Sequence, residues 1–205
     1  MSPSVMARCN FIRLVAFFCL LGAGCKTADK APSANQVAVV PGADGAVLVG
    51  KWLQGCIAAQ SQSVLSSMTF NANGTWTSSV KMFADGSCAS PVYEMITEGT
   101  YVTGQILAAG TAMDRTSTKV SEVFFLDSQI TANNQAGYRG YRNWTKGVPF
   151  TRPAEIPVQY DIFRIEGDLL RLGKVSQVAG SANDGLTPQT RPTEISTQMK
   201  PLTRQ

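Results

Sequence analysis

The sequence predicts an all-β fold, an antiparallel barrel of eight strands. One observation is a period-two alternation of apolar and polar residues that recurs in short segments. A second is that turns rich in glycine, asparagine and aspartate separate these segments, while no stretch shows a strong helical period. Many short strands joined by regular turns are typical of antiparallel barrels and sandwiches.

The N-terminal segment has the pattern of an export signal. Arg8 and Arg13 precede an apolar run at residues 14–21. This run is too short to span a bilayer, which takes about 20 residues. The sequence Leu-Gly-Ala-Gly that leads to Cys25 resembles a bacterial lipobox, in which signal peptidase cuts before the cysteine. We therefore expect residues 1–24 to be a lipoprotein signal peptide and Cys25 to be lipidated, with an ordinary cleaved signal peptide as the alternative.

The residues after Cys25 predict a membrane anchor and a separate domain. Residues 25–45 are rich in small and polar residues, which is typical of a flexible tether. Residues 46–205 are expected to form the barrel. Lys26 rather than aspartate follows the cysteine, and this favours the outer membrane of the bacterial cell envelope. The net charge of +4 includes Arg8 and Arg13, and the sequence has no Lys/Arg-rich run, so no nucleic-acid partner is expected.

The cysteines predict one disulfide bond. Of five cysteines, Cys9 and Cys19 leave with the signal peptide and Cys25 takes the lipid. Cys56 and Cys88 remain, an even number in an oxidising compartment. The chain has no histidine and no C-x-x-C motif, so no metal site is expected. A disulfide that closes a loop of roughly 30 residues stabilises the folded state by about 3–4 kcal/mol, because it restricts the unfolded chain.

Eight segments carry the strand pattern, and the turn at residues 71–74 is the strongest hairpin signal because Gly74 permits a positive φ. The predicted strands are residues 46–53, 64–70, 75–82, 91–101, 105–113, 119–126, 160–165 and 169–175. Residues 127–158 form a long loop that is functional, packed on the barrel or a missed element. Residues from 176 onward are expected to form ordered coil or short edge strands.

Alternation places mostly apolar residues on one face of the strands, and we expect this face to line the barrel. The residues predicted to contact a ligand are Val64, Met68, Phe70, Trp76, Val80, Met82, Tyr93, Met95 and Tyr101. Ser66 and Ser78 lie on the same face and leave room beside the larger side chains. An eight-stranded barrel either fills its interior or holds one small ligand, and the sequence leaves both open.

Two resemblances bear on the fold. Gly50-Lys51-Trp52 on the first strand of an eight-stranded barrel resembles the lipocalin pattern. That resemblance implies that Trp52 plugs one end of the barrel and that an arginine from the far end of the chain, Arg191 or Arg204, covers it. Arg191 is taken with Gly50 and Trp52 as the structural signature.

A longer set of positions is similar to the ectodomain repeat of the adenomatosis-polyposis-coli down-regulated family. The matching positions, in order, are Gly50-Lys51-Trp52, Cys56, the hairpin from Phe70 to Trp76, Asp85 to Cys88, Pro91 to Tyr93, Gly99, Leu172-Gly173, Asp184-Gly185 and Arg191-Pro192. The similarity implies a lipocalin-like barrel with a cavity that accepts lipid. The animal signalling role does not transfer to a bacterial lipoprotein.

Catalysis is not expected. Without histidine, Ser-His-Asp and Cys-His arrangements are excluded. Glu94 and Glu98 share a strand face, but solvated outward carboxylates are the favoured interpretation over a hydrolase pair. No catalytic residue, cofactor or metal is predicted.

The function hypothesis is a lipid-anchored envelope protein that binds an apolar, lipid-like molecule. The alternative is an envelope lipoprotein with a solid barrel that acts in protein interaction or structure. Tyr138, Tyr141 and Trp144 lie close together with two arginines, a composition typical of interfaces. These rings therefore mark a candidate partner surface, or a loop that docks on the barrel.

Overall fold

The computed structural model describes residues 47–154, 158–176, 178 and 180–205. The predicted signal peptide, residues 1–24, the lipidation site Cys25 and the tether at 25–45 lie outside these residues. Within the described chain, no helix has the length and apolar character needed to cross a membrane.

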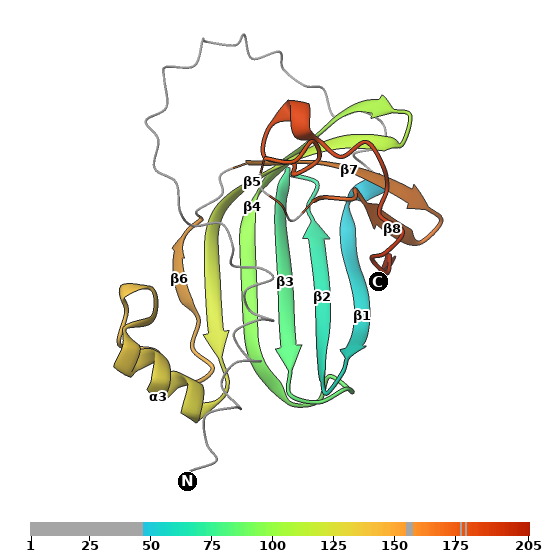
Figure 1. The fold of residues 1–205 in the computed structure, drawn as a ribbon. Helices are drawn as coiled ribbons and strands as arrows, with labels where there is room; N and C mark the ends of the chain where they lie inside the picture. The colour runs from blue at the N-terminus through green and yellow to red at the C-terminus, as the bar shows by residue number, and fades with distance from the viewer. Residues whose placement is uncertain (1–46, 155–157, 177, 179) are drawn as a thin grey trace, which may run out of the picture. The chain divides into compact units, whose positions relative to one another are not determined.

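The described residues form mainly strands. Their elements are β1 (Gly50–Ala59), β2 (Gln62–Phe70), β3 (Thr75–Phe83), β4 (Pro91–Leu107), β5 (Gly110–Phe124), α3 (Asp127–Ala136), η1 (Tyr138–Gly140), β6 (Phe150–Pro153), β7 (Val158–Glu166), β8 (Leu169–Leu172), η2 (Pro188–Thr190) and β9 (Leu202–Arg204). The strands pair in the order β4-β3-β2-β1-β9-β8-β7-β5, and β4 pairs again with β5. This pairing closes an antiparallel eight-stranded barrel, as predicted, and β6 is an extra strand on the edge of β5 (Figure 1).

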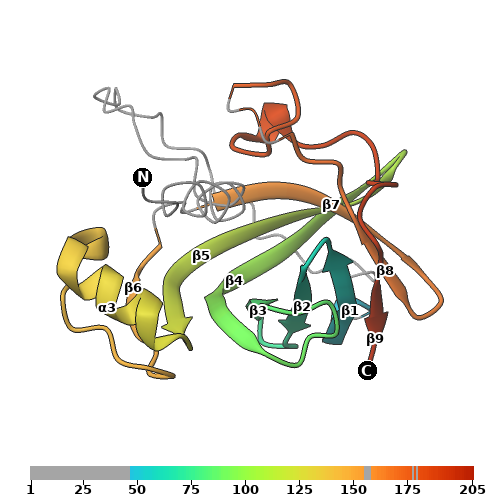
Figure 2. The ribbon, with the colours of Figure 1, turned by 60° about the horizontal axis from the view of Figure 1, so that its bottom comes forward.

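The ring of strands is closed in one half of the barrel only. β1 pairs with β9 at Trp52 and Leu53 alone. β5 pairs with β7 from Thr111 to Thr116, and then with β6 from Lys119 to Glu122. Away from these pairings with β7 and β9, the described parts of β1 to β5 form, together with β6, a curved sheet. Its two free edges are β1 and β6. Figure 1 shows this fan of strands, and Figure 2 turns its open end towards the reader.

The hairpin of β2 and β3 forms where the sequence predicts it. Phe70 lies opposite Trp76, and Gly74 has the positive φ of 78° that the turn requires. The Asn73 side chain accepts hydrogen bonds from the backbone N–H and the hydroxyl of Thr75, at 3.1 and 2.7 Å. Local turn chemistry and alternation agree here, which is why the prediction succeeds.

Other predicted boundaries are wrong. The proposed strand at 105–113 straddles the turn between β4 and β5, and the one at 119–126 is the end of β5. The first strand was expected at 46–53, but β1 extends from Gly50 to Ala59. The eighth strand of the ring is β9, from the C-terminal stretch expected to be coil or short edge strands. The loop at 127–158 contains α3, η1 and β6.

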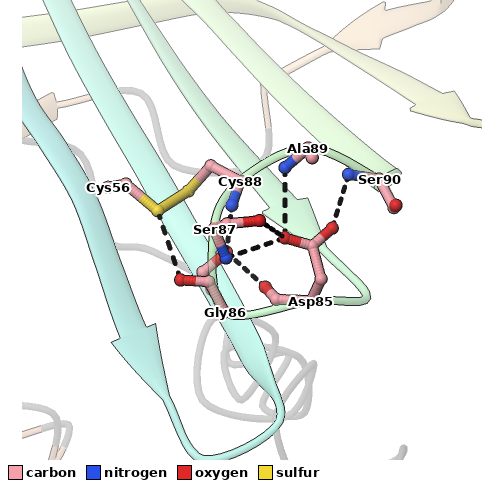
Figure 3. The surroundings of a disulfide bond; sticks show 8 residues. Cys56, Asp85, Gly86, Ser87, Cys88, Ala89 and Ser90 are labelled. Carbon is pink, nitrogen blue, oxygen red and sulfur yellow. Dashed lines mark hydrogen bonds between the residues drawn. A yellow bond between two sulfur atoms is a disulfide. The ribbon is translucent and has the colours of Figure 1, made fainter.

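The predicted disulfide is confirmed. Cys56 on β1 bonds to Cys88 in the turn after β3, and their Cα atoms lie 6.0 Å apart. Asp85 organises this turn, because its carboxylate accepts hydrogen bonds from the backbone N–H groups of Ser87, Ala89 and Ser90 (Figure 3). These bonds and the Ser87 hydroxyl hold the pKa of Asp85 well below its usual range, with the hydroxyl the largest cause. The turn is thus fixed by a sulfur bridge and by an ionised carboxylate.

Candidate binding site

The nine residues predicted to line the barrel share one face of the sheet. Val64 pairs with Met82, which pairs with Tyr93, and Val80 pairs with Met95. Residues at even spacing along a strand project to the same side, and four of the nine lie in the core cluster of the barrel. The alternation therefore identifies the inner face correctly, whereas contact with a ligand stays a prediction.

Burial divides these residues into two groups. Met68, Phe70, Trp76 and Tyr101 are at most 9% exposed and pack with Trp52 into a solid core at the closed end. The remaining five inner residues are only partly buried, although they face the same interior; they are Val64, Val80, Met82, Tyr93 and Met95. Solvent thus reaches the apolar inner face where the sheet is open.

Trp52 fills the closed end, as the lipocalin pattern implies. Its ring is fully buried and its indole N–H donates to the Leu48 carbonyl at 2.8 Å. The arginine that covers it is Arg204, whose guanidinium lies 4.4 Å from the ring centroid and donates to the carbonyls of Val49 and Val47. Gly50 has a φ of 139°, a conformation that residues with a side chain rarely adopt.

Of the two arginines considered for covering Trp52, Arg204 takes that place, and Arg191, which was taken into the structural signature, lies elsewhere. Arg191 donates to the carbonyls of Asp161 and Met113 at 2.7 and 3.2 Å, and to the Asp114 carboxylate at 2.6 Å. It also lies over the Tyr160 ring. Arg191 therefore fastens the C-terminal stretch to β5 and β7, and the short β9 carries Arg204 to Trp52.

A buried polar layer separates the solid core from the open half. Arg115 on β5 is 7% exposed, donates to Asp161 on β7 at 3.0 Å and to Gln159 at 3.0 Å, and lies 5.2 Å from the Trp76 ring centroid. Gly99 on β4 pairs with Trp76 on β3 and with Ser117 on β5, and a Cβ at Gly99 would lie 1.8 Å from the Thr116 carbonyl oxygen. Because Gly99 has no side chain, the Arg115 side chain can reach Trp76 across β4.

The ion pair in this layer is desolvated. Burial raises the pKa of Asp161, against the opposing effect of Arg115 and of the N–H groups of Ile162 and Gly173. Burial likewise lowers the pKa of Arg115. We treat both groups as ionised, because a guanidinium keeps its proton in proteins and the carboxylate accepts three hydrogen bonds. Removing one partner of such a buried pair destabilises the fold by several kcal/mol, because the other charge is left buried and unpaired.

The far end of the inner face carries a second buried carboxylate, Glu122. It is fully buried and accepts a hydrogen bond from the Tyr93 hydroxyl at 2.8 Å. The Nε atoms of Arg139 and Arg152 lie 3.0 and 3.4 Å from its other oxygen. The expectation of an apolar interior is thus incomplete, since charged groups lie at both ends of the open half.

The aromatic residues of the 138–144 loop pack against this end. Tyr138 and Trp144 contact Phe124, with ring centroids 5.9 and 5.0 Å away, and Trp144 is 5% exposed. Tyr141 lies on Phe150 and is 39% exposed. Two of the three rings proposed for a partner surface are therefore engaged with the barrel, as expected for a docking loop, and Tyr141 is the most exposed of the three.

The carboxylates considered for hydrolysis lie apart from this interior. Glu94 bonds to Lys81 and to the Ser79 hydroxyl, at 2.9 and 2.6 Å, and Glu98 bonds to Lys119 at 2.6 Å. Both are cross-strand pairs on the opposite face of β4 from Met95. Within the described part of the chain, no three His, Cys, Asp or Glu residues gather closely enough to hold a metal ion.

Sequence reasoning missed the pair of Arg115 and Asp161 because residue 115 fell between two predicted strands, so Asp161, inside the predicted strand at 160–165, had no visible partner. With β5 assigned from Gly110, the alternation from Met113 to Arg115 would have put an arginine on the inner face. Asp161 alternates in the same way with the buried Phe163. Comparison with known proteins adds no family: no protein-family model matches the chain, and neither does any curated protein.

Proposed function

We propose that this protein binds an apolar, lipid-like molecule in the open half of its barrel, and that lipid on Cys25 anchors it in the bacterial cell envelope, at the outer membrane. The single observation that carries the binding role is the contrast in burial along one inner face. Its closed end is solid, whereas Val64, Val80, Met82 and Met95 remain partly exposed.

That contrast favours a ligand for a physical reason. A large apolar side chain gains about 1.5–3 kcal/mol when it is fully buried, and a solid barrel would realise this gain. Methionine side chains adapt to irregular apolar shapes, and Met82 and Met95 lie on neighbouring strands. Ser66 and Ser78 lie on the same face, opposite Val80 and Thr97, and their small side chains leave room there. A lipid-like chain laid along this face would complete the burial.

The anchoring part of the proposal rests on the sequence alone. The lipobox-like ending supports cleavage before Cys25, and Lys26 supports sorting to the outer membrane. The resemblance to the adenomatosis-polyposis-coli down-regulated ectodomain supports a lipocalin-like, lipid-accepting barrel. Cys25→Ala should abolish lipidation, as measured by the mass of the membrane-associated protein. Unchanged lipidation in this variant would refute the anchor.

The binding role is tested with a fluorescent fatty-acid probe. Wild-type protein should bind the probe saturably, and native mass spectrometry of the purified protein should detect a co-purified lipid. Ser66→Trp, which fills the inner face, should abolish probe binding. Ser67→Trp is the matched control, because Ser67 is the neighbouring residue on the opposite face of β2 and should leave probe binding unchanged.

A wild-type titration without saturable binding would contradict the proposal. The interior would then be solid, and Ser66→Trp would instead lower the free energy of unfolding by roughly 1–3 kcal/mol through overpacking. That result would favour the alternative, an envelope lipoprotein that acts through a protein partner. Tyr141 would be the first surface residue to substitute, because it is more exposed than Tyr138 and Trp144.

A further inference from the structure

Two N–H groups inside the barrel have no acceptor among the described residues. They are the indole N–H of Trp76 and the Nε–H of Arg115. Trp76 is 4% exposed and Arg115 is 7% exposed, so bulk water does not satisfy them. Buried polar groups almost always have a hydrogen-bond partner, and leaving one unsatisfied is costly. Two such donors side by side indicate a missing acceptor.

The donors lie where the inner face begins to open. The Arg115 guanidinium lies over the Trp76 ring, so both residues belong to the buried polar layer between the solid core and the open half. The next inward residues along β3 and β4 are Ser78 and Thr97, which pair with each other and are partly buried. Both side chains are small. A ligand that enters from the open half would therefore meet the two donors at the deepest point it can reach.

The charges of the layer indicate what kind of acceptor fits. The charged groups of this layer are Arg115 and Asp161, which pair at 3.0 Å. The layer thus holds equal numbers of positive and negative groups. An added carboxylate or phosphate would bring an uncompensated charge into a buried site, which is costly. A neutral oxygen accepts the same two hydrogen bonds without that cost.

We propose that Trp76 and Arg115 donate hydrogen bonds to a neutral carbonyl oxygen of the ligand, such as that of an ester or amide, while its hydrocarbon chain lies along the open inner face. This inference rests on the binding role proposed above and specifies its ligand class. It predicts that the protein distinguishes an ester from a hydrocarbon of the same length, and that Trp76 contributes to this selectivity.

The test is displacement of a neutral, apolar fluorescent probe by dodecane, methyl dodecanoate and dodecanoate. Wild-type protein should bind the ester about tenfold more tightly than the hydrocarbon, the effect of about one net hydrogen bond. Trp76→Phe keeps the ring and removes the N–H, and should reduce this ratio to about threefold or less. Trp144→Phe is the control, because it removes another buried, unpaired indole N–H outside the layer, and should leave the ratio unchanged.

The outcomes separate this inference from the proposed function. Binding of the probe with equal affinities for ester and hydrocarbon would overturn the carbonyl site alone and indicate a buried water as the partner of the donors. Tighter binding of dodecanoate than of the ester would overturn the choice of a neutral acceptor. If wild-type protein bound neither probe nor ligand, the binding role itself would fail. An equal loss of the ratio in Trp76→Phe and Trp144→Phe would also overturn the assignment.

Discussion

Arg204 and Trp52 are far apart in the sequence, yet their contact closes the barrel at one end. The guanidinium covers the indole ring and ties two backbone carbonyls that precede β1. The resemblance to the lipocalin pattern identified Gly50 and Trp52 from the sequence. It could not choose between Arg191 and Arg204, because that choice depends on where β9 pairs.

At this scale we predict that Arg204→Met destabilises the protein by about 1–3 kcal/mol. The substitution keeps the apolar stem but removes a cation–π contact of about 0.5–2 kcal/mol and hydrogen bonds of about 0.5–1.5 kcal/mol each. Urea denaturation should show a lower midpoint. Arg171→Met, which breaks a more exposed pair with Glu166, should change the free energy of unfolding by less than about 1 kcal/mol. Equal effects of the two substitutions would contradict the role of Arg204.

At the scale of elements, the sequence predicted correctly the strands and turns that carry a local signal. The β2–β3 hairpin could be predicted because its alternation and its turn agree. The helix α3 was missed because Ile130 is its one buried residue, so its sequence has no apolar stripe. β9 has three residues, too few to show a period. Such elements are held by tertiary contacts, which a single sequence does not display.

The candidate site, likewise, was predictable only where the strands carry a local signal. Alternation found the apolar inner face of β2, β3 and the first part of β4. It did not find the polar layer, because the turn between β4 and β5 carries no turn signal of the kind seen at residues 71–74, and the predicted strand ran through it. Arg115 was thereby assigned to no strand, and its pairing with Asp161 stayed hidden.

The turn around Asp85 gives a prediction for pH dependence. The folded-state pKa of Asp85 is lowered, so the stabilisation is present above the unfolded pKa of about 3.9 and is lost as pH falls through the lower folded value. Amide hydrogen exchange at Ala89 and Ser90 should stay slow at pH 4 and become faster only well below it. The Thr75 amide, which donates to the uncharged Asn73 side chain, is the control and should show no such transition. Loss of protection at Ala89 already near pH 4 would contradict the assignment.

At the scale of the whole barrel, the disulfide lies where strand pairing is weakest. Cys56 belongs to the part of β1 beyond Leu53, where the described chain provides β2 on one side and no strand on the other. The bridge ties this free edge to the turn after β3. It therefore stabilises the open half, in which the proposed ligand lies, while the closed half is held by its core around Trp52.

Removing the bridge should therefore affect the two halves unequally. We predict that Cys56→Ser/Cys88→Ser lowers the free energy of unfolding by about 3–4 kcal/mol, because the residues are 32 positions apart and the bridge restricts the unfolded chain. In the folded variant, amide exchange should accelerate more at Ile57 and Ala58 than at Trp52 and Leu53. Urea denaturation and hydrogen exchange of the two proteins measure both effects, and reduction of the wild-type bridge should reproduce them. Uniform acceleration along β1 would show that the bridge acts on the unfolded chain alone and does not hold the free edge.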